Sequence, residues 1–143
     1  MIRKTAYLAC QPARAFTLFT ERASEWWPKD VRHTRDPQSE IRMLADGRFW
    51  ERAADGHEVE LGRVLVWEPA QRIVLDFYPG TDERHPTEVV VSFSEEDGGT
   101  RVVVEHSPKP ESRELWATGA PKFERSWKLV MAALGEAPLD LER

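Results

Sequence analysis

Hydrophobic and polar residues alternate along the middle of the chain, between Ser39 and His106. An alternation with a period of two is typical of β-strands that bury one face. Turn residues separate the alternating runs, and Asp97-Gly98-Gly99 is the clearest hairpin signal among them. The pattern predicts six successive strands, at residues 39–44, 48–52, 57–67, 72–78, 88–93 and 102–106. In the third strand, Gly62 separates two runs of opposite parity, which predicts a β-bulge.

The N-terminal part of the chain predicts a strand followed by two short helices. Residues 2–9 alternate in the same way as the later strands. Pro12 then stands where a helix is favoured to begin, and the apolar residues Phe16 and Phe19 follow it. A second helical segment, at residues 21–27, is expected to end before Pro28, because the residue before a proline disfavours the helical conformation.

The C-terminal part shows a helical pattern, in which apolar residues recur at steps of three and four and so share one face. These residues are Trp116, Ala120, Phe123, Trp127, Val130, Met131 and Leu134. Gly119 and Pro121 weaken a helix that runs through them. We therefore expect a short turn at residues 113–117 and a main helix from about residue 121 to residue 136.

The order of elements predicts an α+β fold in a single domain, residues 1–143. A helix with two Trp and one Phe on one face needs a broad, concave apolar partner, and the sheet is the only candidate. We expect a curved antiparallel sheet of about seven strands around a long C-terminal helix, with two short helices after the first strand. A sheet curled around a helix can enclose a cavity, so binding a molecule there is the first hypothesis.

Composition and charge exclude several classes of protein. The net charge of −5 argues against nucleic-acid binding, which requires a basic face. No run approaches the ~18 consecutive apolar residues of a membrane span. A single cysteine, Cys10, excludes an internal disulfide and suits a reducing compartment. The first residues lead directly into a strand without a signal-peptide core, so we expect a cytoplasmic protein.

Sequence templates for catalysis and for metal binding are not met. His57-Glu58-Val59-Glu60 lacks the second histidine of the HExxH zinc motif, and the chain has no CxxC pair. Gly98-Gly99 belongs to a hairpin and does not precede a helix, so it is no phosphate loop. We therefore expect no metal, no cofactor and no catalytic residue set, and we expect a binding protein in preference to an enzyme.

Strand parity and helix periodicity indicate which side chains face the cavity. The candidates for ligand binding are Trp26, Trp50, Trp67, Phe77, Val91, Val104, His106, Phe123 and Trp127. The alternative interpretation is that most of them fill a core. His106 is the polar member of this set, and it continues the apolar parity of Val102 and Val104. A buried neutral imidazole is the favoured interpretation of His106, ahead of a catalytic base.

Two further groups of polar residues have open alternatives. Arg48, Arg52 and Arg63 could meet a ligand carboxylate, but a cross-strand ladder with the glutamates Glu51, Glu60, Glu88 and Glu105 on the outer face is favoured. His33 follows the Trp26-Trp27 pair in a loop, where it can face either solvent or a pocket rim. Two adjacent tryptophans are difficult to turn inward together from one short helix, which leaves Trp27 as a candidate surface contact.

Several short motifs occur in order along nearly the whole chain. They are Ala15-Phe16-Thr17-Leu18-Phe19-Thr20, Trp26-Trp27-Pro28, Asp55-Gly56-His57-Glu58, Leu61-Gly62-Arg63-Val64, Val66-Trp67-Glu68-Pro69, Thr87-Glu88-Val89, Gly99-Thr100-Arg101-Val102 and Glu105-His106. As an ordered set they resemble the bacterial activator of heat-shock protein 90 ATPase homologue-like branch of the SRPBCC superfamily, which is START-like and birch-pollen-allergen-like. The resemblance implies a helix-grip fold, in which a curved antiparallel sheet grips the C-terminal helix around an apolar cavity.

Three functional hypotheses follow. The leading one is non-catalytic binding of a small apolar or amphipathic molecule between the sheet and the C-terminal helix. The first alternative, which the resemblance suggests, is a protein-interaction module that acts like a chaperone ATPase activator. The second alternative is a cyclase-like enzyme that uses His106 as its acid or base.

Overall fold

A computed structural model of the chain describes residues 1–79 and 82–137. Its elements are β1 (Ile2–Leu8), α1 (Pro12–Thr20), α2 (Ala23–Trp26), the 3-10 turn η1 (Lys29–Val31), β2 (Glu40–Met43), β3 (Arg48–Arg52), β4 (Glu58–Glu68), β5 (Arg72–Phe77), β6 (Thr87–Glu96), β7 (Gly99–Pro108), the 3-10 turn η2 (Pro110–Ser112) and α3 (Arg113–Gly135). The predicted order of strand, two short helices, six strands and long helix is confirmed.

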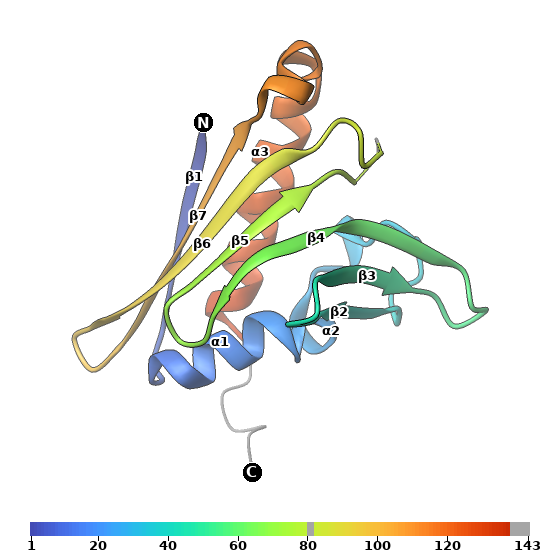
Figure 1. Cartoon of the computed structure of the whole chain (residues 1–143). Coiled ribbons are helices and arrows are strands. Elements are labelled where there is room, and N and C mark those ends of the chain that lie inside the picture. The colour runs from blue at the N-terminus through green and yellow to red at the C-terminus, as the bar shows by residue number, and fades with distance from the viewer. Residues whose placement is uncertain (80–81, 138–143) are drawn as a thin grey trace.

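The seven strands of the described residues form one antiparallel sheet in the order β1-β7-β6-β5-β4-β3-β2. Consecutive strands pair as neighbours except for β1, which joins β7 and so brings the two ends of the domain together. The sheet is strongly curved, and α3 lies along its hollow face, against β1 (Figure 1). The α+β helix-grip architecture is therefore present as expected.

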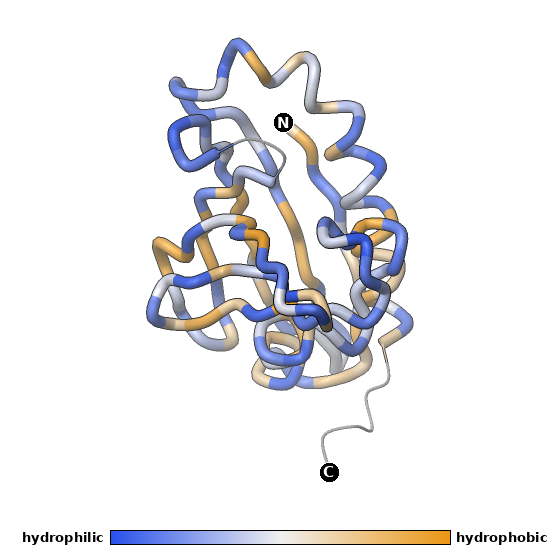
Figure 2. Tube along the Cα trace, turned by 90° about the vertical axis from the view of Figure 1, so that its right-hand side faces the viewer, coloured by the Kyte–Doolittle hydropathy of each residue, from blue (hydrophilic) through white to orange (hydrophobic). Residues whose placement is uncertain are grey.

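Burial follows the alternation that the sequence shows. Figure 2 displays apolar and polar residues alternating along the trace, and in β5 and β6 buried residues alternate with half-buried ones. The short helices α1 and α2 cover one end of the hollow (Figure 1), where Phe16 and Phe19 pack on Phe93 with ring centroids 5.2 and 6.1 Å apart. The other end of the hollow carries the site described below.

The helix α3 runs without a break from Arg113 to Gly135, with Pro121 inside it. The expectation of a short turn and a separate main helix was therefore wrong. Pro121 has no backbone N–H, so one carbonyl of the preceding turn loses its helical partner. Pro121 lies on an exposed side of the helix, where water can satisfy that carbonyl. On either side of the proline, Trp116 and Phe123 pack on the same residue of the sheet, His106, and this tertiary contact stabilises both halves as one helix.

Two shifts of register interrupt the pairing of β4, and the bulge expected near Gly62 is confirmed. Phe49 pairs with Gly62, whereas the next residue of β3, Trp50, pairs with Glu60, so Leu61 is the extra residue. Gly62 also lies against β5, where a Cβ atom would come within 2.1 Å of the Asp76 carbonyl oxygen. Glycine is required there because the two backbones approach too closely for any side chain.

The strand β3 turns opposite residues inward from those expected. Phe49 faces the interior and stacks on Phe77 at 6.0 Å, whereas Trp50 lies on the outer face between two arginines. The guanidinium carbons of Arg48 and Arg52 lie 5.1 and 4.6 Å from the Trp50 ring. The inward assignment of Trp50 was wrong, because two adjacent aromatics leave the parity of a five-residue strand undecided.

Replacing Gly62 by alanine tests the close approach of β4 and β5. The new methyl group would meet a backbone oxygen that cannot move independently, so Gly62→Ala is expected to lower the free energy of unfolding by about 3 kcal/mol or more. The control is Gly135→Ala at the end of α3, where the nearest atom to an added Cβ is 4.0 Å away. Chemical denaturation measures both, and equal stabilities for the two variants would contradict the argument.

Candidate functional site

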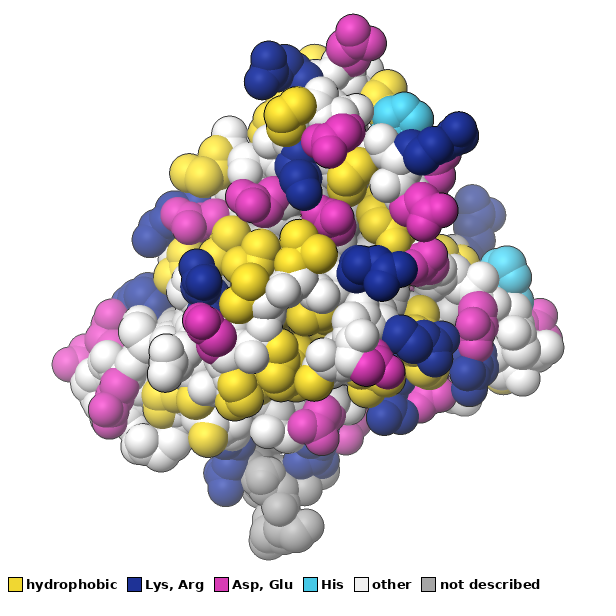
Figure 3. Space-filling model, viewed as in Figure 1, with side chains coloured by type: hydrophobic (Ala, Val, Ile, Leu, Met, Phe, Trp, Pro, Cys, Tyr) yellow, Lys and Arg dark blue, Asp and Glu magenta, His cyan; other side chains and the backbone are white. Residues whose placement is uncertain are grey.

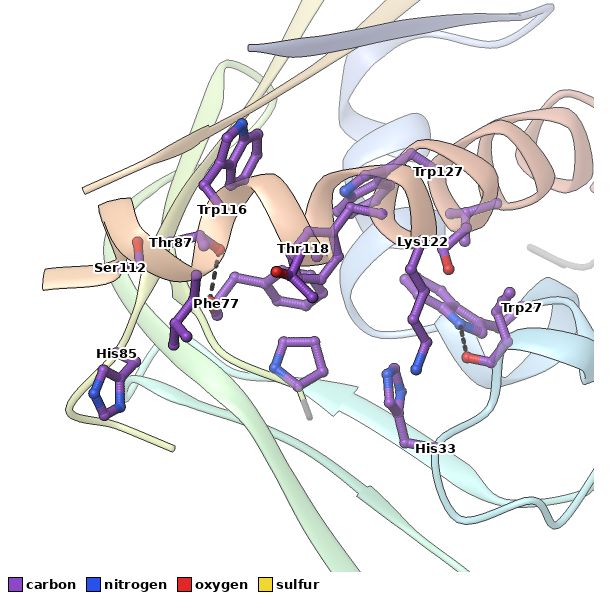
Figure 4. A pocket seen from close by; sticks show the side chains of 17 residues that line it. Trp27, His33, Phe77, His85, Thr87, Ser112, Trp116, Thr118, Lys122 and Trp127 are labelled. Atoms are coloured by element: carbon purple, nitrogen blue, oxygen red, sulfur yellow. Dashed lines mark hydrogen bonds between the residues drawn. The ribbon is translucent and has the colours of Figure 1, made fainter. Parts of the chain in front are cut away.

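A cavity of about 320 Å³ opens between α3 and the curved sheet, at the end of the hollow away from α1 (Figure 4). One wall is a face of α3, and the opposite wall comes from the end of β5, the start of β6 and the segment after α2. Its lining residues are Trp27, Val31, His33, Phe77, Pro79, His85, Thr87, Ser112, Leu115, Trp116, Thr118, Gly119, Lys122, Phe123, Ser126, Trp127 and Val130.

Aromatic rings form most of the apolar lining. Phe77 on β5 faces Phe123 and Trp127 on α3, with ring centroids 6.1 and 5.7 Å apart. Trp116 continues the wall toward the start of the helix, 6.0 Å from Phe123, and Trp27 meets Trp127 edge-on at 6.5 Å. Steps of three, four and seven residues place the helix side chains on one face, which is why the sequence pattern identified this surface.

His106 lies directly behind the aromatic wall and is fully buried. The indole N–H of Trp127 donates to His106 Nδ1 at 2.9 Å. On the other side, His106 Nε2 lies 2.6 Å from Thr87 Oγ1, and the Thr87 hydroxyl donates to the backbone oxygen of Phe77 at 2.7 Å. An indole nitrogen can only donate, so Nδ1 must be the acceptor and Nε2 carries the proton that it donates to Thr87.

Burial keeps His106 neutral, and its hydrogen bonds suit the neutral imidazole. Burial, with a smaller contribution from the positive N-terminal amine, lowers the pKa of His106 from 6.5 to about 3. Protonation at Nδ1 would also turn this acceptor into an N–H donor that faces the indole N–H of Trp127. Because both ring nitrogens are engaged, His106 has no free nitrogen for proton transfer in this conformation; its geometry is that of a satisfied buried imidazole.

A second buried polar group, Glu51, positions the segment that carries His33. Glu51 is completely buried, and its carboxylate accepts hydrogen bonds from the backbone N–H groups of His33 and Thr34 at 2.8 and 2.9 Å. It also accepts from the hydroxyls of Thr34 and Ser39 at 2.6 and 2.9 Å. The expected place of Glu51 in an outer-face ladder was wrong, because β3 turns Phe49 and Glu51 inward together.

Arg32 is the buried cation near this carboxylate. It is 7% exposed and donates to the backbone oxygens of Ser24, Trp27 and Ser39 at 2.6–2.9 Å. Its charge and that of Glu51 favour one another, which partly offsets the cost of burying both. Together the two side chains tie the segment after α2 to β2 and β3, and so hold His33 at the rim of the cavity.

Basic residues stand at the mouth of the cavity. Lys122 on α3 and His33 on the opposite rim point toward each other, and His85 lies farther along the mouth (Figure 4). The pKa of His33 is lowered mainly by burial, with Lys122 lowering it further and Glu51 opposing both. His85 is engaged by Asp82, whose carboxylate lies 2.9 Å from His85 Nδ1.

The nine residues expected to face the cavity fall into four groups. Phe77, Phe123 and Trp127 line it, and His106 supports them from behind. Trp26, Val91 and Val104 are buried in the core, outside the lining. Trp67 packs edge-on against Phe16 at 5.1 Å, at the α1 end of the hollow. Trp50 lies on the outer face, as described above.

Sequence reasoning missed Trp27 as a lining residue, and the structure shows why both tryptophans can be buried. Trp26 ends α2, whereas Trp27 has extended backbone angles, φ −60° and ψ 130°. This change of backbone lets both side chains turn inward, where their ring centroids lie 5.4 Å apart. Each is 7% exposed. The indole of Trp26 donates to the Leu18 oxygen at 2.8 Å and that of Trp27 to the Val31 oxygen at 3.4 Å. The assignment of Trp27 to the surface was therefore wrong.

Other lining residues had a partial signal in the sequence. Trp116 lies on the apolar stripe of the C-terminal helix, and His33 was open to either solvent or a pocket rim. Lys122 carried no signal, because it belongs to no motif. Thr87 lies in the Thr87-Glu88-Val89 motif, but nothing in that motif marked it as a lining residue. Within residues 1–79 and 82–137, His, Cys, Asp and Glu side chains form no cluster that could hold a metal ion. The helices of these residues include none with the length and hydropathy of a membrane span.

The depressed pKa of His106 makes a prediction for stability at acid pH. In the unfolded chain the imidazole gains a proton below about pH 6.5, whereas in the folded protein it stays neutral down to about pH 3. The contribution of His106 to the free energy of unfolding is therefore fully present above pH 6.5. As the pH falls from 6.5 to 3, this contribution decreases by up to about 1.4 kcal/mol per pH unit.

The variant His106→Gln isolates this contribution. It removes the titrating group while leaving all other ionisable side chains in place. The difference in free energy of unfolding between the native protein and the variant, measured by denaturant titration at several pH values, is expected to shrink steadily below pH 6.5. A difference that stays constant from pH 8 to pH 4 would show that His106 is not held neutral by the fold.

Several solved structures resemble this one closely in fold. CalC from Micromonospora echinospora, a self-sacrificing resistance protein, superposes with a TM-score of 0.74 at 22% identity, over 99% of this chain and 94% of its own. Protein NE0264 from Nitrosomonas europaea gives 0.64 at 14% identity, over 94% and 91% of the two chains. Protein CV1439 from Chromobacterium violaceum gives 0.62 at 16% identity, over 94% of each. At these identities the likeness shows the fold alone.

Sequence comparison assigns the family. No curated protein sequence matches this chain. The family model described as Activator of Hsp90 ATPase homolog 1-like protein matches residues 9–137, which include every element from α1 to α3 and the whole lining of the cavity. The chain therefore belongs to the Activator of Hsp90 ATPase homolog 1-like family, within the SRPBCC fold.

Proposed function

We propose that this domain binds a small apolar or amphipathic molecule in the cavity between α3 and the sheet, without catalysing a reaction. The observation that carries the proposal is the cavity itself, about 320 Å³ in volume and walled by five aromatic side chains, with a few polar groups at its rim. Small-molecule sites in proteins have this size and this composition. A cytoplasmic location, which the single buried Cys10 supports, is part of the same proposal.

The construction of the walls supports binding more than chemistry. The hydrogen bonds of His106 fix Trp127 and Thr87, and the hydrogen bonds of Glu51 fix the rim that carries His33. A cavity whose walls are held in place before a ligand arrives loses little conformational entropy on binding. The fold alone decides nothing here, because the same fold occurs in a resistance protein and in a family named for activating an ATPase.

Blocking the cavity tests the proposal. Ser126 lies on α3 between Phe123 and Trp127 and lines the cavity. The variant Ser126→Phe places a ring in that space, and it is expected to weaken binding of any cavity ligand by roughly tenfold or more, since the lost volume cannot be recovered elsewhere. Binding is measured by titrating fatty acids and flat aromatic compounds while following tryptophan fluorescence, to which Trp27, Trp116 and Trp127 contribute from the walls.

The control is Leu129→Phe, an equal ring on the exposed side of the same helix, where Leu129 is 45% exposed. It should bind as the native protein does. If the native protein shows no saturable change with any compound of the panel, or if Ser126→Phe binds as tightly as Leu129→Phe, the cavity is not the binding site.

A second candidate function, protein interaction, is favoured by the outer face of the sheet. Val66, Val74 and Val90 pair directly across β4, β5 and β6 and form a row of half-buried apolar side chains. Leu65, in the second bulge of β4, is 49% exposed. Figure 3 shows apolar side chains gathered over the middle of this face and charged side chains around them. Exposed patches of this kind are typical of protein contacts.

Placing a charge on this outer patch tests the second function. The variant Leu65→Arg is expected to lose proteins that the native domain recovers from a cell extract by pull-down, because a buried guanidinium opposes an apolar contact. The control Leu129→Arg introduces the same charge on α3 and should recover them. Identical recovery with both variants and the native domain would exclude the outer patch as the contact.

A further inference from the structure

Only basic ionisable side chains line the cavity, although the chain as a whole is acidic. The sequence holds 25 acidic and 20 basic residues, yet the ionisable members of the lining are Lys122, His33 and His85. None of the 17 described lining residues is Asp or Glu. A lining without Asp or Glu offers no carboxylate to pair with a cationic ligand, whereas its basic side chains can pair with an anionic one.

The carboxylates nearest to the mouth are already engaged by other groups. Glu51 lies behind His33, with Oε1 3.9 Å from Nδ1, but it is fully buried and accepts four hydrogen bonds from its own surroundings. Asp82 lies outside the lining and pairs with His85 and with Arg84. Neither is available to neutralise the positive charge at the other end of the mouth.

That positive charge belongs to Lys122. Lys4 and Lys109 each form an ion pair, with Glu124 and Asp76. Over residues 1–79 and 82–137, by contrast, Lys122 has no carboxylate partner. Its amine is directed across the mouth toward His33 (Figure 4), and the rings of Phe123 and Trp127 line the same cavity. An anion at this position would form an ion pair with Lys122. It would also offset the repulsion by which Lys122 lowers the pKa of His33.

We propose that the natural ligand is an amphipathic organic anion, such as a carboxylate, whose apolar body lies between α3 and the sheet and whose anionic group pairs with Lys122 opposite His33. This inference rests on the proposed binding function and adds the chemical class of the ligand. The aromatic walls accept a flat or flexible hydrocarbon body, and Lys122 at the rim supplies the charged recognition point.

Two matched pairs of probes test the charge of the ligand. Each pair keeps the body and changes only the head: 2-naphthoate against 2-naphthylmethanol, and decanoate against decanol. Calorimetric titration of the native protein at pH 7.5 is expected to show the acid binding roughly three- to tenfold more tightly than the alcohol of at least one pair, an effect of the size expected for a partly exposed ion pair. This preference should decline as salt is added, while the affinity for the alcohol stays constant.

The variant Lys122→Met removes the charge and keeps the length of the side chain. It is expected to lose the preference for the acid while its affinity for the alcohol stays within about twofold. The control Lys128→Met removes an exposed lysine that lies on α3 outside the lining, and it should retain the preference. Circular dichroism establishes that both variants are folded.

The outcomes separate this inference from the function on which it rests. If the native protein binds the acid and the alcohol equally, or if Lys122→Met keeps the full preference for the acid, the anionic ligand is excluded and the apolar cavity site stands. If neither pair binds to the native protein, the proposed binding function fails and the inference fails with it.

Discussion

The hydrogen-bonded chain from Trp127 through His106 and Thr87 to the Phe77 carbonyl joins α3 to three strands of the sheet. The direction of every bond in it is fixed: the indole donates to the imidazole, the imidazole donates to the hydroxyl, and the hydroxyl donates to a backbone oxygen. A chain with this polarity fixes the tautomer of the histidine and the orientation of both tryptophan and threonine. Because both ring nitrogens of His106 and the Thr87 hydroxyl are paired and buried, loss of any link would leave a buried group unpaired, which costs more than the bond itself contributes.

The cavity depends on that chain for its shape. Side chains normally fill the space between a helix and a curved sheet. They do so at the α1 end, where Phe16 and Phe19 of α1 meet Phe93 of β6. At the other end, Trp127 and Phe123 are held against His106 and Phe77, and so they form a wall instead of a plug. The second buried group, Glu51, holds the opposite rim in the same manner. Two buried polar centres thus hold the walls of an apolar space, and Lys122 stands at its mouth.

The hydrophobic pattern predicted the strands closely, because a strand that buries one face leaves a local alternation of apolar and polar residues in the sequence. It was less informative at three positions. In β3, Phe49 and Trp50 are adjacent and both apolar, so parity had no preference between them, and the pairing with a bulged β4 decided the question. At Trp27 the end of α2 changed the backbone from helical to extended, which a helical projection cannot represent. At Pro121 a local penalty was outweighed by packing of the helix on both sides of it.

Periodicity and residue type were enough to predict the order of elements, the antiparallel sheet, the long apolar-faced helix and the inward position of His106. The open hollow, the three aromatic candidates that line it and the burial of Glu51 beneath the rim emerged from the folded arrangement alone. The folded arrangement also places Lys122 at the mouth, across from His33, which lies almost ninety positions earlier in the sequence. Contacts between segments so far apart depend on how the sheet curves. Gly62 marks one bulge in the sequence, but the strand pairing that sets the curvature as a whole is not encoded by a local pattern.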